Sequence, residues 1–466
     1  MEPNTGNLRR ETWGSRMAFV LAAAGSAIGL GNIWRFPYLT GQNGGAAFVF
    51  IYVTIVLLIG LPVMMAEVSL GRVTRRNPVG AFERAAPNSA WRNVGVLGVI
   101  TGFAILSYYS VVAGWTLGYT LKAATGAFAR LTDPGETGAM FGRFVGDGPT
   151  VLGFHALFMA LTVAVVMGGV RRGIERWTLI LMPILFLMLM LLVLRSLTLE
   201  GAWKGIAFYL KPDFSKVTTA TFLAALGQAF FSLSLGMGAM ITYGSYLSQS
   251  EDVVVATASV SLFDTVIALL AGLAIFPALF SVEGTEPTVG PKLVFVVLPS
   301  IFQRIPFGGL FGAVFFVLLV VAALTSAISL LEVCVAYLTD EKGWTRHKAC
   351  FLAGGGAFIL GIPAALSTGA STFLSNLLFQ MGFLDLMDML FGNVALTLGA
   401  FLLCLFVGWR WAPEDALAAA MEGSAYPGLG RPWFLLIRYL CPFAIGTILL
   451  SKTGLLELLM KLLVQG

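Results

Sequence analysis

Long apolar runs recur along the chain and are separated by short polar stretches. A membrane-spanning helix needs about 20 mostly apolar residues, and eleven segments meet that requirement. The pattern therefore predicts an all-α polytopic membrane protein with 11 transmembrane helices. These segments lie near residues 15–39, 45–70, 93–121, 150–169, 176–197, 219–247, 253–281, 307–338, 347–366, 379–408 and 432–450.

The first of these segments contains residues that disfavour a continuous helix. Gly25 to Pro37 reads Gly-Ser-Ala-Ile-Gly-Leu-Gly-Asn-Ile-Trp-Arg-Phe-Pro. Each Gly costs about 1 kcal/mol of helix propensity relative to Ala, and lipid supplies no water for the backbone groups that a break exposes. Irregular backbone at this depth is tolerated only where protein shields it or where it lines a cavity. We therefore expect this segment to build a binding site near the bilayer midplane.

The sixth segment shows the same anomaly. Gly227 to Gly238 reads Gly-Gln-Ala-Phe-Phe-Ser-Leu-Ser-Leu-Gly-Met-Gly, which mixes glycines and hydroxyls into a span. Small residues also allow helices to pack closely, so one such segment would be ambiguous. Two interrupted helices in matching places of two five-helix halves are typical of an inverted-repeat transporter, which holds substrate and ions at the repeat interface.

This arrangement divides the chain into two five-helix repeats followed by an eleventh helix. The repeats are expected at 15–197 and 219–408, and the last helix at 432–450. The remaining segments are expected to be a cytoplasmic N-terminal segment (1–14), an external loop (198–218), a cytoplasmic loop (409–431) and an external C-terminal tail (451–466).

Composition and charge agree with a membrane protein and exclude several other classes. The chain is 58% hydrophobic and 11% charged, far from a soluble globular average. Lys and Arg gather in the loops 71–92 and 170–176, which places these loops and the N-terminus in the cytoplasm. The net charge of +5 is therefore a matter of orientation and indicates no nucleic-acid partner. The four cysteines form no CxxC pair and the two histidines stand alone, so neither a disulfide framework nor a His/Cys metal site is expected.

Two polar clusters inside other spans bring further chemistry to the breaks. Asp264 lies in the seventh segment, and an intramembrane carboxylate is a functional candidate by default. Thr325 and Ser326 lie in the eighth, although such hydroxyls often bond only to their own helix. Carbonyls released by a helix break, together with hydroxyl and amide oxygens, form a shell suited to Na⁺. The N-terminal ends of half-helices suit an anionic group instead.

The chain resembles the neurotransmitter:sodium symporter family, and in particular its bacterial Na⁺-dependent amino acid transporters. The resemblance implies the leucine-transporter-type fold, a 5+5 inverted repeat with broken helices 1 and 6, and alternating access across a bacterial inner membrane. The motifs that carry it are Trp13-Gly-Ser-Arg16 with Gly25–Pro37, Asn43-Gly-Gly, Pro62 with Glu67 and Gly71-Arg72, Gly227–Gly238 with Thr242-Tyr243, and Leu324-Thr-Ser326.

Two Na⁺ sites follow from the resemblance. The first would use the carbonyl of Ala27, the amide oxygen of Asn32, Ser232, Asp264 and the substrate carboxylate. The second would use the carbonyls of Gly25, Ile28 and Ala322 and the hydroxyls of Thr325 and Ser326.

Asp264 also bears on the anion requirement. Relatives that need chloride have a neutral residue there and a serine one turn later, where this chain has Ala268. We therefore expect transport that is independent of chloride, with Asp264 supplying the negative charge.

The resemblance also assigns a substrate pocket. Backbone N–H groups of Leu30 and Gly31 and the Tyr109 hydroxyl would hold a carboxylate, and Gly29 stands where amine-transporting relatives carry an Asp. An amino acid with a hydrophobic or aromatic side chain is thus expected. The implied substrate residues are Ser26, Ala27, Leu30, Gly31, Ile105, Tyr109, Phe231, Ser232, Ser234, Met237, Ala327 and Leu330.

Gates and structural residues complete the assignment. Arg35 and Asp388 would close the external side, and Arg10 and Asp340, aided by Trp13 and Tyr246, the cytoplasmic side. Orientation charge is a competing explanation for Arg10. Glu67 is expected to bond the unwound amides near Gly236, with proton relay as the alternative. Gly173 and Pro183 are expected either to let the fifth helix unwind or merely to kink it.

Three other functions stay open on the sequence alone. A carrier of a small substrate such as glycine, alanine or taurine would share most of the site, as would an amino acid sensor or channel that does not pump. An intramembrane enzyme is not expected, because no His or Cys stands beside an acid and no metal motif is present. The sequence indicates no oligomeric state.

Overall fold

The computed structural model describes residues 11–128, 134–281, 292–378 and 380–452. In these ranges the regular elements are helices, apart from an isolated bridge between Leu378 and Met381. Nine helical segments among them are long and apolar enough to cross a membrane, and each overlaps one predicted segment. They are α3–η2–α4 (Ala46–Thr74), α6 (Arg92–Ala124), α8 (Gly148–Met167), η4–α9 (Val170–Leu197), α13 (Val253–Phe280), α15 (Gly308–Lys342), α16 (Arg346–Leu366), α18–η7–α19–η8 (Phe383–Arg410) and η9–α21–η10–α22 (Pro427–Ser451).

The two remaining predicted segments are both broken. The first consists of α1 (Arg16–Ala27), then η1 (Gly31–Arg35) and α2 (Phe36–Gln42), and its two halves are bent by 52°. The sixth consists of α11 (Thr219–Ser232) and α12 (Ala239–Gly244), with residues 233–238 unwound between them. Among the described residues, nine predicted segments are thus helices long enough to span a membrane, and the first and sixth predicted segments each consist of short helices separated by a break.

Backbone conformation explains why α11 stops where it does. Ser234, Gly236 and Gly238 have φ angles of 54°, 83° and 75°, which place all three in the left-handed region. Gly236 is the most constrained, because a Cβ there would also collide with the carbonyl oxygen of Leu396. A glycine is therefore needed at this position for the chain to unwind against the neighbouring helix.

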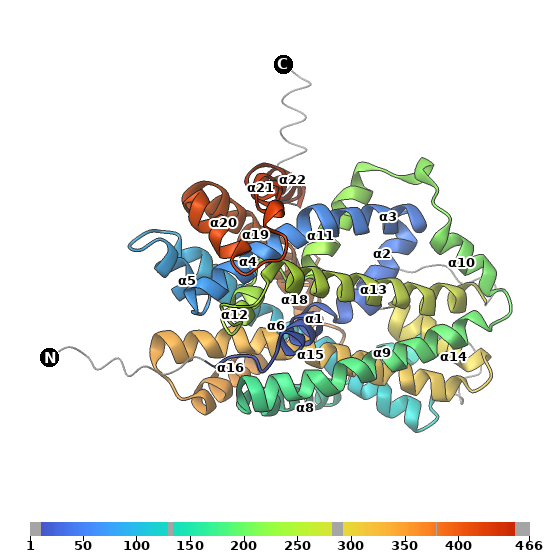
Figure 1. The fold of residues 1–466 in the computed structure, drawn as a ribbon. Helices are drawn as coiled ribbons and strands as arrows, with labels where there is room; N and C mark the ends of the chain where they lie inside the picture. Colours follow the sequence, from blue (N-terminus) through green and yellow to red (C-terminus); the bar gives the residue numbers. More distant parts are fainter. Residues whose placement is uncertain (1–10, 129–133, 282–291, 379, 453–466) are drawn as a thin grey trace, which may run out of the picture.

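The broken helices lie among the long ones. α6 and α15 pack along each other, and α1 contacts α13, α15 and α9 (Figure 1). The short helices α5 (Pro78–Ala85) and α20 (Pro413–Met421) lie at one end of the bundle, and α10 (Ala202–Leu210) and α14 (Leu298–Arg304) lie at the other (Figure 1). The remaining short elements are α7 (Pro134–Gly146), η5 (Phe214–Lys216), η6 (Leu293–Val297) and α17 (Thr372–Ser375).

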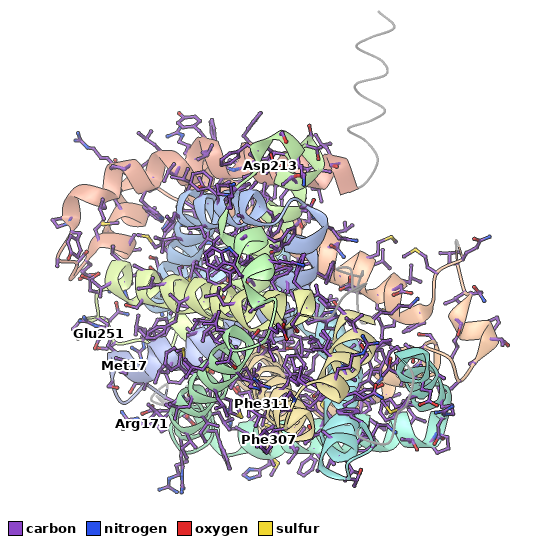
Figure 2. All side chains as sticks on the ribbon, turned by 90° about the vertical axis from the view of Figure 1, so that its right-hand side faces the viewer. Met17, Arg171, Asp213, Glu251, Phe307 and Phe311 are labelled. Carbon is purple, nitrogen blue, oxygen red and sulfur yellow. The ribbon has the colours of Figure 1, made fainter. Side chains whose placement is uncertain are left out.

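The outer surface of the bundle is rich in large apolar side chains, which project from the helices in Figure 2. Leu187 on α9 is 67% exposed, Ile359 on α16 is 66% exposed and Phe443 on α22 is 76% exposed. A soluble monomer rarely exposes so much contiguous apolar surface. The polar residues of the two breaks are, by contrast, buried. The fold thus turns apolar side chains toward lipid and polar backbone toward the interior.

Candidate functional site

A small cavity of about 30 Å³ lies where the break in α1 faces the unwound segment after α11. Three residues of the expected substrate pocket, Leu30, Ser232 and Ala327, do not line it, while all the others do. Gly29, Ser326 and Leu396 line it in addition to the expected set. The lining residues are Ser26, Ala27, Gly29, Gly31, Ile105, Tyr109, Phe231, Ser234, Met237, Ser326, Leu330 and Leu396.

One face of this cavity is polar. The backbone N–H of Leu30 donates to the Tyr109 hydroxyl at 3.3 Å, so two of the three groups expected to hold a carboxylate lie side by side. Ser234 donates to the carbonyl of Ser26 at 2.9 Å, which ties the two broken helices together. Ser26 in turn donates to Ser329 at 2.7 Å. Ser329 was not among the predicted residues, since a hydroxyl inside an apolar helix gives no sign of its partner.

Gly29 lies on the polar face of the cavity and allows the Ser326 and Tyr109 hydroxyls to approach the backbone closely. A Cβ at this position would lie 2.5 Å from the Ser326 hydroxyl oxygen and 2.8 Å from the Tyr109 hydroxyl oxygen. The site as it stands therefore has no space for a side chain at residue 29.

Oxygen atoms converge on the Ser326 hydroxyl beside the first break. Its Oγ lies 3.5 Å from the Gly25 carbonyl oxygen, 3.4 Å from that of Ile28 and 3.4 Å from that of Ala322. Thr325 Oγ1 lies 3.0 Å from the same Ala322 oxygen, within its own helix. The structure thus brings all five residues of the second expected ion site together around one hydroxyl, with no charged side chain among them.

Two other residues of the first expected ion site, Asn32 and Ser232, contact Asp264, which is fully buried on α13. Ser232 Oγ lies 3.0 and 2.9 Å from the two carboxylate oxygens. The side-chain nitrogen of Asn32 donates to Asp264 Oδ1 at 2.7 Å, while the Asn32 oxygen accepts from the Gly29 N–H at 3.2 Å. The amide therefore turns its nitrogen, not the expected oxygen, toward the carboxylate, and a rotation of 180° would exchange the two. Ala27 lines the adjacent cavity.

Two buried side chains near this carboxylate were missed from the sequence. The Tyr52 hydroxyl lies 3.3 Å from both Asp264 Oδ2 and Ser232 Oγ. Gln228 donates to the Gly31 carbonyl at 2.9 Å, which joins α11 to η1. A polar residue in an apolar segment was the available signal for both. Their partners lie more than 170 positions away in sequence, so only the fold reveals what they bond.

A larger cavity of about 230 Å³ adjoins the first one and shares Gly31, Tyr109 and Phe231 with it. Arg35 and Asp388, the expected external gate, both line this cavity. They form no ion pair, although both lie in the part of the chain that the structure describes.

Each member of the expected gate has another partner instead. The Arg35 guanidinium lies over the Phe231 ring, 4.7 Å from its centroid. Asp388 accepts from the Tyr108 hydroxyl and from the Asn393 amide, each at 3.0 Å. The two charges thus face one cavity without closing it.

The opposite end of the site is closed by the start of α1. The indole nitrogen of Trp13 donates to the Tyr243 carbonyl at 3.0 Å, and the Trp13 N–H donates to the Tyr246 carbonyl at 3.1 Å. Arg10 lies outside the described residues. Its expected partner Asp340 accepts from the backbone and side-chain N–H groups of Asn77 at 3.1 and 3.2 Å.

A buried ion pair also lies at this end and was not predicted. Glu332 on α15 is fully buried and bonds the Arg346 guanidinium at 2.5 Å. The Tyr246 hydroxyl donates to the same carboxylate at 2.7 Å. The rule that marks Asp264 as an intramembrane carboxylate applies equally to Glu332. The partner could not be read from the pattern, because the turn between α15 and α16 brings the two together.

The expected structural residues lie as follows. Glu67 Oε1 accepts from the backbone N–H of Gly236 at 2.7 Å, inside the unwound segment. Gly173 lies in the π-helical stretch η4 and Pro183 lies within α9. A Cβ on Gly173 would collide with the Val165 carbonyl oxygen. The start of this helix is therefore packed backbone to backbone against the end of α8.

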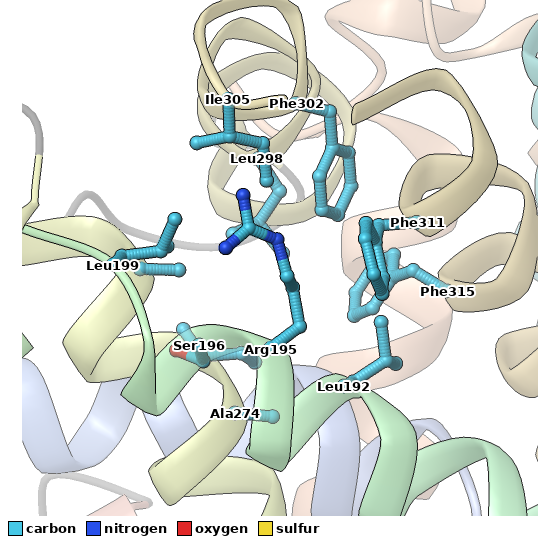
Figure 3. A pocket seen from close by; sticks show the side chains of 12 residues that line it. Leu192, Arg195, Ser196, Leu199, Ala274, Leu298, Phe302, Ile305, Phe311 and Phe315 are labelled. Carbon is cyan, nitrogen blue, oxygen red and sulfur yellow. The ribbon is translucent and has the colours of Figure 1, made fainter. Parts of the chain in front are cut away.

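Another cavity of about 30 Å³ lies away from these groups, among α9, α13, α14 and α15 (Figure 3). Its lining is apolar except for Arg195 and Ser196. The Arg195 guanidinium donates to Thr198 Oγ1 at 2.9 Å and to the Pro306 carbonyl at 3.3 Å. No set of polar groups converges on this cavity, so it lacks the features of the site between the breaks.

Comparison with known proteins identifies the family. A model of the sodium:neurotransmitter symporter family matches residues 10–132 and 150–453. An uncharacterised sodium-dependent transporter of Bacillus subtilis, YhdH, is 44% identical over 447 residues, which cover 96% of this chain and 98% of that protein. The chain belongs to the sodium:neurotransmitter symporter family. It is therefore a multi-pass membrane transporter that depends on sodium.

Other relatives of this symporter extend the comparison. The crystal structure of MhsT in complex with L-phenylalanine matches with a TM-score of 0.87 and 45% identity, over 95% of this chain and 100% of that one. The mouse sodium- and chloride-dependent GABA transporter 2 is 29% identical over 381 residues, 72% of this chain and 63% of that protein. The symporter thus has the leucine-transporter-type fold, with its inverted repeat and broken helices 1 and 6.

Proposed function

We propose that this symporter couples the inward movement of Na⁺ to the uptake of a hydrophobic or aromatic L-amino acid by alternating access. The observation that carries this proposal is the cavity between the breaks, where the Tyr109 hydroxyl, which accepts from the Leu30 N–H, lies next to a group of apolar side chains. The Leu30 N–H and the Tyr109 hydroxyl hold the substrate carboxylate. Carbonyls of Ala27 and of the unwound segment accept from its ammonium group.

The side-chain subsite takes an uncharged group. Ile105, Phe231, Met237 and Leu330 line it and carry no charge. The related transporter MhsT has been solved in complex with L-phenylalanine, an amino acid with an aromatic side chain. At Gly29 no carboxylate is available to pair with a free amine, which disfavours monoamines. Met237 adapts its shape readily and permits several side chains.

Two Na⁺ ions bind in this proposal. One lies beside Asp264 with Asn32, Ser232 and the Ala27 carbonyl, and the substrate carboxylate completes its shell. The other lies where the carbonyls of Gly25, Ile28 and Ala322 converge near the hydroxyls of Thr325 and Ser326. Four carbonyl oxygens lie within 3.5 Å of Ser326 Oγ, which has one proton to donate. The Ser26 and Ala322 carbonyls also accept from Ser234 and Thr325, and a cation would satisfy those of Gly25 and Ile28.

Transport is independent of chloride in this proposal. Hydroxyls of Tyr52 and Ser232 and the amide of Asn32 all face the Asp264 carboxylate. The Asp264 carboxylate is the anion to which these donors bind, so they need no chloride ion from solution.

Alternating access uses the two ends of the site. Arg35 and Asp388 approach each other when substrate fills the site, and Trp13 and Tyr246 separate when it opens inward, with Arg10 and Asp340 assisting. Unwinding of the η4–α9 helix between Gly173 and Pro183 admits water to the second ion. The N-terminus lies in the cytoplasm of a bacterial cell and the C-terminus outside.

Uptake by the purified protein in liposomes tests the proposal. An inward Na⁺ gradient should drive labelled L-leucine above its external concentration, and collapsing the gradient should release it. Unlabelled phenylalanine, leucine and tryptophan should compete better than glycine, alanine or taurine. Replacing chloride with gluconate should leave the rate unchanged.

Other results would assign another function. Equilibration without accumulation would indicate a channel, and binding without uptake a sensor. Preferential competition by glycine or alanine would make this a small-substrate carrier, which the small volume of the cavity would suit.

A further inference from the structure

The helical segment Phe383–Arg410 contributes one wall of the cavity. No residue of this segment was in the expected substrate pocket. Leu396 is the first residue of α19 (Leu396–Leu405), is 2% exposed and lines the cavity together with Met237 and Leu330. Ala327, the residue expected there from the eighth helix, does not line it. The apolar end of the cavity is therefore closed partly by α19.

The cavity is too small for a large side chain as it stands. Its volume of about 30 Å³ is far below the roughly 300–1,000 Å³ typical of ligand pockets. A bulky substrate must therefore displace part of the lining. The substrate side chains that fit are then set by which lining residues can move and which cannot.

Met237 and Leu396 differ in this respect. Met237 lies in the unwound segment and has a flexible, unbranched side chain. Leu396 lies on a helix whose backbone is in direct contact with that segment. A Cβ on Gly236 would collide with the Leu396 carbonyl oxygen, and a Cβ on Gly399 would collide with the Gly236 carbonyl oxygen. Because close-packed backbones do not shift independently, Leu396 is the rigid part of the wall.

We propose that Leu396 is a specificity-determining residue whose side chain contacts that of the substrate and sets the largest side chain that the site accepts. The proposal rests on the substrate class proposed above and adds the residue that sets its upper size limit. Leu396 then limits the size of the substrate side chain, and the flexible Met237 lets the site accept several side chains below that size.

The test compares the order of preference among substrates, not the overall rate. Wild type, Leu396→Ala, Leu396→Val and Leu396→Phe are reconstituted, and labelled L-leucine uptake is competed with alanine, valine, phenylalanine and tryptophan. One methylene in an apolar pocket changes discrimination by about 10-fold or more. Leu396→Ala should therefore shift the ratio of tryptophan to alanine affinity about 10-fold toward tryptophan, and Leu396→Phe should shift it the other way. Leu390→Ala, on the same helical segment but 43% exposed, should keep the wild-type order.

The outcomes separate this proposal from the proposed function. If the wild type accumulates no amino acid, the transport proposal fails, and Na⁺-dependent equilibrium binding of the same amino acids to the purified variants decides on Leu396. An unchanged order in the variants, with only a uniform loss of affinity or rate, overturns the role of Leu396. If Leu396→Ala does not fold, the valine and phenylalanine variants carry the comparison.

Discussion

The Ser326 hydroxyl lies within 3.5 Å of the carbonyl oxygens of Gly25, Ser26, Ile28 and Ala322. A hydroxyl has one proton and donates to one acceptor at a time. The Ala322 carbonyl lies inside α15 and also accepts from Thr325, and the Ser26 carbonyl also accepts from Ser234. The carbonyls of Gly25 and Ile28 lie at the end of α1, where no further helical turn supplies N–H groups. Buried acceptors left in this way are costly unless a cation or a donor satisfies them.

We therefore predict that Ser326→Ala weakens Na⁺ binding. The concentration of Na⁺ that gives half-maximal uptake should rise about tenfold, since a factor of ten corresponds to about 1.4 kcal/mol. Thr339→Ala is the matched control, because Thr339 lies on the same helix and bonds only to the carbonyls of Val335 and Ala336. An unchanged Na⁺ dependence in Ser326→Ala would remove this residue from the ion site.

Asp264 allows a prediction about anions. In Asp264→Asn the hydroxyls of Tyr52 and Ser232 face a neutral amide in place of a carboxylate, and a chloride ion would supply the missing charge. Uptake by this variant should depend on chloride, whereas wild-type uptake should be the same in gluconate. Asp213→Asn, at an exposed loop position, is the control. Uptake by Asp264→Asn that is active and indifferent to chloride would contradict the assignment.

At the scale of elements, the break after α11 depends on a carboxylate from another helix. Glu67 on α4 accepts from the Gly236 N–H at 2.7 Å, and the unwinding of residues 233–238 exposes that N–H. A buried donor that loses its partner costs about 1–3 kcal/mol. The packing of α4 beside the unwound segment therefore places the Glu67 carboxylate where the Gly236 N–H has no helical acceptor.

Glu67 variants distinguish structural support from proton relay. Glu67→Gln keeps an acceptor oxygen and should retain uptake and thermal stability. Glu67→Ala leaves the Gly236 N–H unpaired and should lower the midpoint of thermal unfolding and abolish most uptake. A relay needs an ionisable group, so loss of coupling in Glu67→Gln without loss of stability would favour that alternative.

Some contacts between helices cannot be predicted from the pattern of residues. Periodicity located α15 and α16 well, and Glu332 stands out as an acid inside a span. Its pairing with Arg346 nevertheless arises only when the two helices turn back on each other. In the same way, nothing in the sequence distinguishes Leu396 from the other leucines of its helix. Its place beside the cavity depends on the close backbone packing of Gly236 and Gly399.

At the scale of the whole molecule, the two ends of the site differ. A cavity of about 230 Å³ lies on the side of Arg35 and Asp388, which are not paired. On the other side Trp13 is 7% exposed and bonded to two tyrosine carbonyls. The site thus adjoins a larger cavity at one end and is sealed by Trp13 at the other, as the proposed alternating access requires of one of its states.

We predict that substrate closes the larger cavity. Leu384 lines it and is half-buried, so Leu384→Cys should react with a membrane-impermeant thiol reagent in Na⁺ alone and be protected when substrate is added. Adding Asp388→Asn should weaken this protection, because an Arg35–Asp388 pair contributes about 0–1 kcal/mol to closure. The native cysteines are buried and give a low background.

An exposed control makes this experiment informative about orientation too. Asp213→Cys, in the loop before α11, should react in intact cells whether or not substrate is present. Its failure to react from outside would reverse the expected topology. Equal protection of Leu384→Cys with and without Asp388→Asn would remove Asp388 from the gate.

The amino-acid sequence was enough to predict the class of protein, its long apolar helices and the positions of the two breaks. These features depend on local physics, namely the length of an apolar run and the cost of glycine and polar backbone in lipid. Only the packing of the helices shows which oxygen atoms converge on Ser326, which donors surround Asp264, and that Leu396 of α19 lines the cavity. Those contacts join residues far apart along the chain, and their partners depend on how the helices pack.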